Sequence, residues 1–105
     1  MKENSISKDF QKGLGMLNGK HYKKAIEFFQ RDLDKEPDNY ASLNNMGLAK
    51  SHVSIENNNI SLLEEAIENF KQAICLVKNL DNDEFPIAEA NLKWALEEYS
   101  KMESK

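Results

Sequence analysis

The 105-residue sequence contains little of what interrupts helices or builds disulfide frameworks. It has four glycines, two prolines and a single cysteine, Cys75. So few glycines and prolines argue against long loops and favour a helical protein. One cysteine cannot form an intramolecular disulfide, and no Cys/His spacing is typical of a zinc site. We therefore expect a reducing compartment, no metal and no other cofactor.

The sequence also lacks an excess of positive charge and long apolar runs. Its 18 acidic and 14 basic residues give a formal net charge of -4, a balance that repels the phosphate backbone of nucleic acid. No apolar stretch approaches the length needed to cross a bilayer, and the first ten residues lack the apolar run of a signal peptide. These features predict a cytoplasmic protein that binds neither nucleic acid nor membrane.

Apolar residues instead recur at the three- and four-residue spacing of amphipathic helices. The pattern predicts an all-α protein with one domain, residues 1–105, and five helices, near 7–17, 22–36, 40–55, 61–77 and 85–104. Ser7 is expected to cap the first helix, and Asn18 and Gly19 to form the turn that follows it. Ser61 is expected to cap the fourth helix, and residues 81–83 to form a turn before the fifth.

Two segments repeat the same set of small and aromatic residues. Each copy has a glycine in its first helix, then an alanine, then a phenylalanine four residues later: Gly13, Ala25 and Phe29, and Gly47, Ala66 and Phe70. The two glycines lie 34 residues apart. Small residues are required where two helices touch, because a larger side chain would force their axes apart. We therefore expect these residues to form the scaffold.

With this period and this order of residues, the sequence resembles the tetratricopeptide repeat family. The resemblance implies antiparallel helical hairpins stacked as a short right-handed α-solenoid. Its parts would be a first repeat at about 6–39, a second at about 40–80 and a capping helix at about 85–104. The second repeat is longer than the family period, which predicts a loop insertion at 55–60 between its helices. Asp32 stands where the family prefers a small residue.

The resemblance also implies a function. In this family the first helix of each repeat lines a concave groove that usually holds a peptide or helix of another protein. We therefore expect a non-enzymatic protein-binding module or adaptor. The candidate partner-binding residues form three rows across the groove, with Glu98 toward one end: Gln11, Asn45 and Asn91; Leu14, Leu48 and Trp94; and Phe10, Asn44 and Ala90.

The residue types in these rows suit protein binding. Side-chain amides can donate to and accept from an extended peptide backbone, and a partly exposed tryptophan is a frequent interface anchor. An alternative for each stays open. Asn45 and Asn91 could instead serve contacts between helices, and Trp94 could instead cover the end of the core.

The sequence also bears on two further classes of function. Catalysis has little support, because His21 has no nucleophile or orienting partner, and the pair His52 and Glu56 is too small to hold a metal. Self-association has more support. Two repeats and a cap are fewer units than usually bury a continuous core, so exposed apolar edges at the terminal helices could pair two copies as a homodimer.

Overall fold

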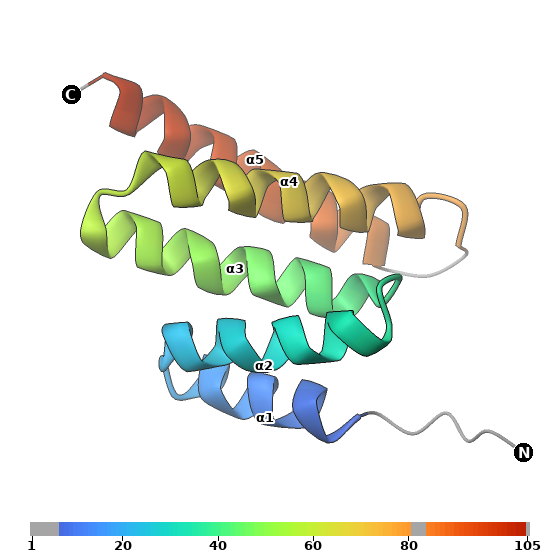
Figure 1. The fold of residues 1–105 in the computed structure, drawn as a ribbon. Helices are drawn as coiled ribbons and strands as arrows, with labels where there is room; N and C mark the ends of the chain where they lie inside the picture. The colour runs from blue at the N-terminus through green and yellow to red at the C-terminus, as the bar shows by residue number, and fades with distance from the viewer. Residues whose placement is uncertain (1–6, 81–83, 105) are drawn as a thin grey trace, which may run out of the picture.

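The computed structural model of the protein describes residues 7–80 and 84–104, so the turn expected at 81–83 lies outside the described residues. These ranges contain five α-helices and no strands, which confirms the predicted all-α class. The helices are α1 (Lys8–Asn18), α2 (Tyr22–Lys35), α3 (Tyr40–Asn57), α4 (Ile60–Val77) and α5 (Glu84–Glu103). Successive helices run in opposite directions, and α1 and α5 lie at the two ends of the array (Figure 1).

Each helix packs mainly against the next one along the chain. The central helix α3 contacts α2 and α4 along its length, and it also touches both α1 and α5. No helix in the described ranges combines the length and the apolar content needed to cross a bilayer.

The two repeated glycines lie directly against phenylalanine rings. A Cβ atom added to Gly13 would lie 2.6 Å from Cε1 of Phe29, and one added to Gly47 would lie 2.7 Å from Cε1 of Phe70. Such distances are well inside van der Waals contact, so only glycine lets each helix pair approach this closely. Both phenylalanines, and the alanines four residues before them, are 0% exposed. The predicted scaffold role of this repeated set is confirmed.

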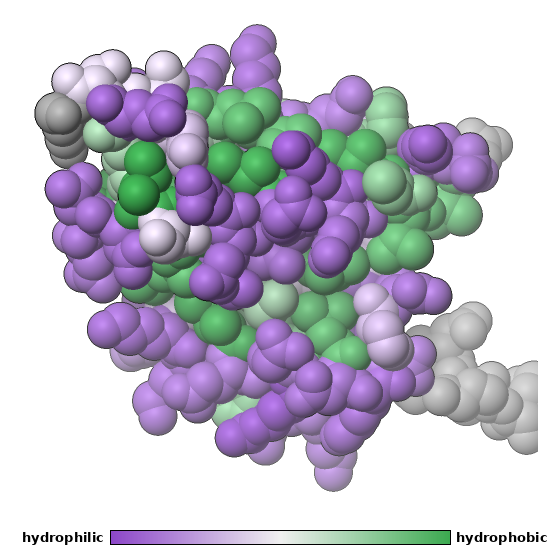
Figure 2. All heavy atoms as spheres, turned by 45° about the horizontal axis from the view of Figure 1, so that its top comes forward, coloured by the Kyte–Doolittle hydropathy of each residue, from purple (hydrophilic) through white to green (hydrophobic). Residues whose placement is uncertain are grey.

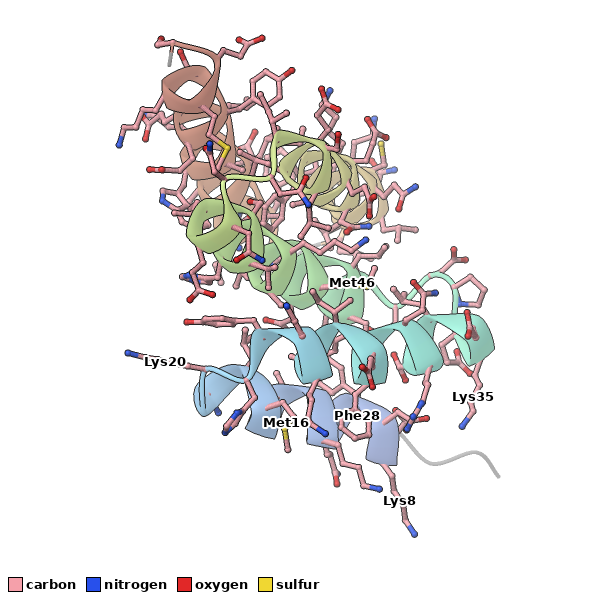
Figure 3. The ribbon with its side chains drawn as sticks, turned by 60° about the vertical axis from the view of Figure 1, so that its left-hand side comes forward. Lys8, Met16, Lys20, Phe28, Lys35 and Met46 are labelled. Atoms are coloured by element: carbon pink, nitrogen blue, oxygen red, sulfur yellow. The ribbon has the colours of Figure 1, made fainter. Side chains whose placement is uncertain are left out.

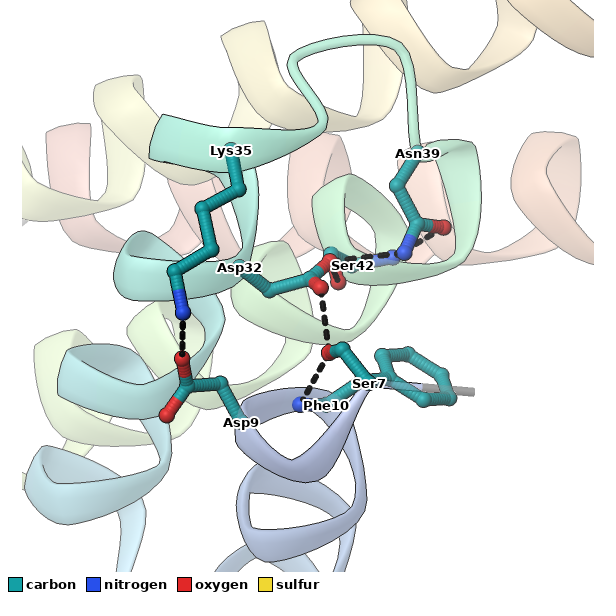
Figure 4. A network of polar contacts seen from close by, with 7 residues as sticks. All are labelled: Ser7, Asp9, Phe10, Asp32, Lys35, Asn39 and Ser42. Atoms are coloured by element: carbon teal, nitrogen blue, oxygen red, sulfur yellow. Dashed lines mark hydrogen bonds and ion pairs between the residues drawn. The ribbon is translucent and has the colours of Figure 1, made fainter. Parts of the chain in front are cut away.

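Asp32 is buried at the junction of α1, α2 and α3, with only 1% of its surface exposed. Its carboxylate accepts hydrogen bonds from the Ser7 hydroxyl at 2.5 Å, the Asn39 amide at 2.7 Å and the Ser42 hydroxyl at 2.6 Å (Figure 4). Ser7 and Asn39 are the N-caps of α1 and α3. The predicted cap at Ser7 is therefore confirmed. These three hydrogen bonds satisfy the buried carboxylate of Asp32, although a small residue was expected at this position.

The connection between α3 and α4 differs from the predicted loop at 55–60. The helix α3 continues to Asn57 and α4 begins at Ile60, so the extra residues lengthen these helices to 18 residues each. Asn58 has a φ of 53°, in the left-handed region that asparagine tolerates better than most residues. Asn59 caps α4, because its Oδ1 accepts a hydrogen bond from the Leu62 backbone N–H at 3.1 Å. The prediction that Ser61 caps this helix is wrong.

Candidate functional site

Three aromatic rings from three different helices form a row, which we call the aromatic row: Tyr22, His52 and Trp94. The Tyr22 and His52 rings stack with their centroids 4.5 Å apart and an interplanar angle of 7°. The Trp94 ring is tilted by 47° to His52, with the centroids 5.4 Å apart. All three residues are half-buried. Since the three residues belong to α2, α3 and α5, the row crosses most of the array. Part of each residue remains open to solvent.

A hollow of about 280 Å³ opens at the Tyr22 end of the aromatic row, and we call it the lysine hollow. Its lining consists of Lys20, His21, Tyr22, Lys23, Lys24, Val53 and Glu56. Three exposed lysines thus stand against one carboxylate, so the hollow carries an excess of positive charge. Lys20 extends outward from the turn between α1 and α2 (Figure 3). Lys20 is also the residue of this turn that has a positive φ, 64°. The sequence predicted that Asn18 and Gly19 would form the turn.

The environment of His52 changes its acidity. Burial lowers the pKa of His52 below its ordinary value of 6.5, the carboxylate of Glu56 opposes this shift, and the charge of Lys20 adds to the lowering. His52 is therefore mainly neutral at pH 7. A neutral imidazole can stack on the Tyr22 ring without the cost of desolvating a charge.

Several residues of the predicted rows do reach the surface. Gln11 is exposed, and Leu14, Asn45, Leu48 and Trp94 are half-buried. The two leucines pack against the core clusters beneath them while keeping part of their surface open. The structure brings Trp94 into contact with His52, a residue that the sequence analysis did not include in the predicted rows.

Two residues of the predicted rows, Phe10 and Asn44, are not available to a partner. Phe10 is 8% exposed, and its ring centroid lies 5.9 Å from that of Phe29 in the core. Asn44 is 7% exposed, and its Oδ1 accepts a hydrogen bond from Asn91 Nδ2 at 3.0 Å. The prediction that Phe10 and Asn44 line a surface groove is wrong. The Asn44–Asn91 hydrogen bond joins α3 to α5, as the alternative interpretation of the asparagines proposed.

Glu98 is half-buried and forms an ion pair with Lys101, whose Nζ lies 3.2 Å from Glu98 Oε2. Exposed ion pairs of this kind contribute little to stability. Within residues 7–80 and 84–104, no three His, Cys, Asp or Glu side chains gather in a cluster that could hold a metal ion. The aromatic row and the lysine hollow thus bring half-buried rings and an excess of positive charge to the surface.

The sequence reasoning did not find Tyr22 or the lysine hollow. Three of the lysines fall within residues 20–24, beside a tyrosine. That local density was the available signal. The stacking of Tyr22 on His52 had no sequence signal, because it depends on how far α2 is shifted along α3.

Comparison of this chain with models of protein families, with curated proteins and with solved structures gave no match.

Proposed function

We propose that this chain is a non-enzymatic protein-binding module that holds a segment of another protein along the aromatic row. The observation that carries the proposal is the contact of Tyr22, His52 and Trp94, three ring side chains supplied by three helices. Rings that hold one another in place lose little conformational freedom on binding. Partly exposed aromatic residues of this kind supply much of the energy at protein interfaces.

The proposal includes a tetratricopeptide-like scaffold beneath the aromatic row. It is supported by the close packing of Gly13 on Phe29 and of Gly47 on Phe70, which repeats the same contact in two helical hairpins. It is also supported by the contacts of α3 with both α1 and α5, since first helices of neighbouring repeats touch in such an array. The right-handed solenoid and its concave groove belong to this proposal.

The chemistry of the surface defines the partner segment that we propose. An apolar side chain would pack on Trp94 and the exposed part of Leu48. A carboxylate would lie at the lysine hollow, where three lysines outnumber the single Glu56. The half-buried Asn45 could bind the backbone of the segment through its amide. We therefore propose an acidic, amphipathic segment of another protein as the ligand.

The experiment begins by capturing partners on the immobilised full chain and identifying them by mass spectrometry. The segment that binds is then titrated by calorimetry against the parent, Trp94→Ala and Leu96→Ala. Leu96 is the matched control, because it is an exposed residue of α5 that lies about 200° around the helix from Trp94. We expect Trp94→Ala to weaken binding by at least about tenfold and Leu96→Ala to leave it within about twofold. Equal affinity of Trp94→Ala and the parent, with unchanged circular dichroism, would refute the proposal.

The lysine hollow is tested separately with the variant Lys23→Glu/Lys24→Glu. Reversing both charges should weaken binding of the same segment, and the parent affinity should fall as salt is added. Lys12→Glu, on α1 and outside the lining of the hollow, is the control and should bind like the parent. A segment whose affinity is independent of salt and of Lys23 and Lys24 would show that the hollow takes no part.

A further inference from the structure

An apolar groove lies between α4 and α5 at the end of the array, and we call it the terminal groove. Its volume is about 620 Å³, and its lining consists of Ile74 of α4 and six residues of α5: Glu89, Leu92, Lys93, Leu96, Glu97 and Ser100. Leu96 is 46% exposed. Figure 2, which brings the top of the view in Figure 1 forward, shows hydrophobic residues open to solvent between hydrophilic ones. No helix in the described chain covers this surface.

The corresponding face of α3 is covered by another helix. Residues 87–95 align with 41–49, which places Lys93 of α5 at the position of Gly47 in α3. On α3, α4 packs over this position with the Phe70 ring against the glycine. Lys93 cannot allow so close an approach, because its side chain occupies the space that the ring would need. The terminal groove therefore suits a helix that packs at a greater distance than α4 does on α3.

We propose that the occupant of the terminal groove is a second copy of this chain, with the two α5 helices packed antiparallel about a two-fold axis that passes the groove side of α5 at the level of residue 95. The charges on α5 carry this proposal, because they alternate in sign at intervals of four residues: Glu89, Lys93, Glu97 and Lys101. Antiparallel alignment about residue 95 places Lys93 opposite Glu97 of the second copy and Glu89 opposite its Lys101. Two-fold symmetry makes each of these pairs twice.

The partners in this alignment are largely unused within one copy. Among the described residues, Glu89, Lys93 and Glu97 form no ion pair, while Lys101 pairs with Glu98. A helix of an unrelated protein would need its own matching charge pattern, whereas α5 already has one that matches itself. This self-complementarity favours a second copy over another partner.

The apolar residues fit the same alignment. In this alignment Leu92 of one copy lies opposite residue 98 of the other. Leu92 and the second copy's Leu96 are therefore offset by only two residues, or about 3 Å along the helix axis. Leu92 packs against the core cluster formed by α4 residues and Ala95. At about 100° per residue, Leu96 lies about 40° around α5 from Leu92, whereas Lys93 and Glu97 lie about 100° and 140° from it. The interface would then have an apolar stripe beside a charged edge, as in antiparallel coiled coils. Burial of the leucines would drive association, and the charges would set the direction of pairing.

The test is sedimentation velocity of the full chain from about 1 μM to about 1 mM, a range that covers weak and moderate dimers. We expect a reversible monomer–dimer equilibrium in the parent. Leu96→Gln should raise the dimer dissociation constant by at least about tenfold, because it places polar groups in the apolar stripe. Ile87→Gln is the matched control: Ile87 is 48% exposed, close to Leu96 at 46%, but lies on the opposite face of α5. It should change the dissociation constant by less than about twofold.

A charge exchange tests the alignment itself. Lys93→Glu should weaken the dimer, most strongly at low salt, because like charges then face each other twice. The double variant Lys93→Glu/Glu97→Lys should recover most of the affinity, because each pair is reversed rather than removed.

Two results would overturn this proposal. The first is a parent protein that stays monomeric at every concentration. The occupant of the terminal groove would then be a helix of a different protein. The second is a double variant as weak as Lys93→Glu alone. The inference does not depend on the proposed function, since Trp94 lies on the opposite face of α5 from Leu96. A variant that loses only dimerisation should keep binding through the aromatic row.

Discussion

The Ser42 hydroxyl donates a hydrogen bond of 2.6 Å to the carboxylate of Asp32, and neither residue is more than 1% exposed. The bond ties α3 to α2. Because Ser7 and Asn39 donate to the same carboxylate, the buried charge also holds the N-caps of α1 and α3. A buried carboxylate is tolerated only with such donors, and each donor in turn depends on the carboxylate.

Replacing Asp32 should therefore destabilise the protein strongly. Asp32→Ala leaves three polar groups without their acceptor, and we expect the free energy of unfolding to fall by about 2–4 kcal/mol. Urea denaturation followed by circular dichroism measures this loss. The control is Asp34→Ala, an exposed aspartate of the same helix, which should change stability by less than about 0.5 kcal/mol. Similar midpoints for the two variants would contradict the role given to Asp32.

The glycine–phenylalanine contact can be tested with two matched substitutions. Gly47→Ala places a methyl group 2.7 Å from the Phe70 ring, and we expect it to lower stability by about 1–3 kcal/mol. Gly15→Ala meets nothing within 4 Å and should raise stability by about 0.5–1 kcal/mol, because alanine is the better helix former. Thermal and urea unfolding compare the two. If Gly47→Ala were also stabilising, the close packing of α3 on α4 would be wrong.

The cap of α4 distinguishes the structure from the sequence-based expectation. Asn59→Ala removes the side chain that accepts from the Leu62 N–H and should lower stability by about 1 kcal/mol. Ser61→Ala should have little effect, since Ser61 lies inside the helix and is exposed. If urea denaturation showed a larger loss of stability for Ser61→Ala than for Asn59→Ala, Ser61 would be the cap of α4.

Stability should depend on pH through His52. Its pKa is lower in the folded state than the ordinary value of 6.5, so the unfolded chain binds the proton more readily. This contribution to stability is complete above about pH 7 and is lost as the pH falls through 6.5 and below. Unfolding measured between pH 7.5 and 5.5 should show this decline in the parent and less of it in His52→Phe.

The fold could largely be predicted because its signals are local. Apolar spacing predicted the helices, and the repeated small residues predicted where helices touch. The structure adds that the glycines there lie against rings, Gly13 on Phe29 and Gly47 on Phe70. The connection at 55–60 could not be predicted in this way. Its asparagines favour turns, yet the packing of α3 against α4 extends both helices until only Asn58 and Asn59 remain between them.

The candidate site was harder to predict, because it depends on rotation and offset of whole helices. Phe10 and Gln11 were both placed in the groove, but adjacent helical residues point about 100° apart. Gln11 is exposed and Phe10 is buried, as this geometry requires. Trp94 was placed in the groove by its alignment with Leu14 and Leu48 and by its residue type. Its neighbour His52 was found only once α3 and α5 were positioned relative to each other.

The central position of α3 predicts which helices unfold locally most often. Because this helix is packed on both long sides, its amides should exchange with solvent more slowly than those of α1 and α5, which each have one open side. The order of exchange should thus run from the ends of the array inward. Since each helix packs mainly on its neighbour in sequence, the contacts that α3 organises are local, and folding should be fast, on a timescale of roughly microseconds to milliseconds.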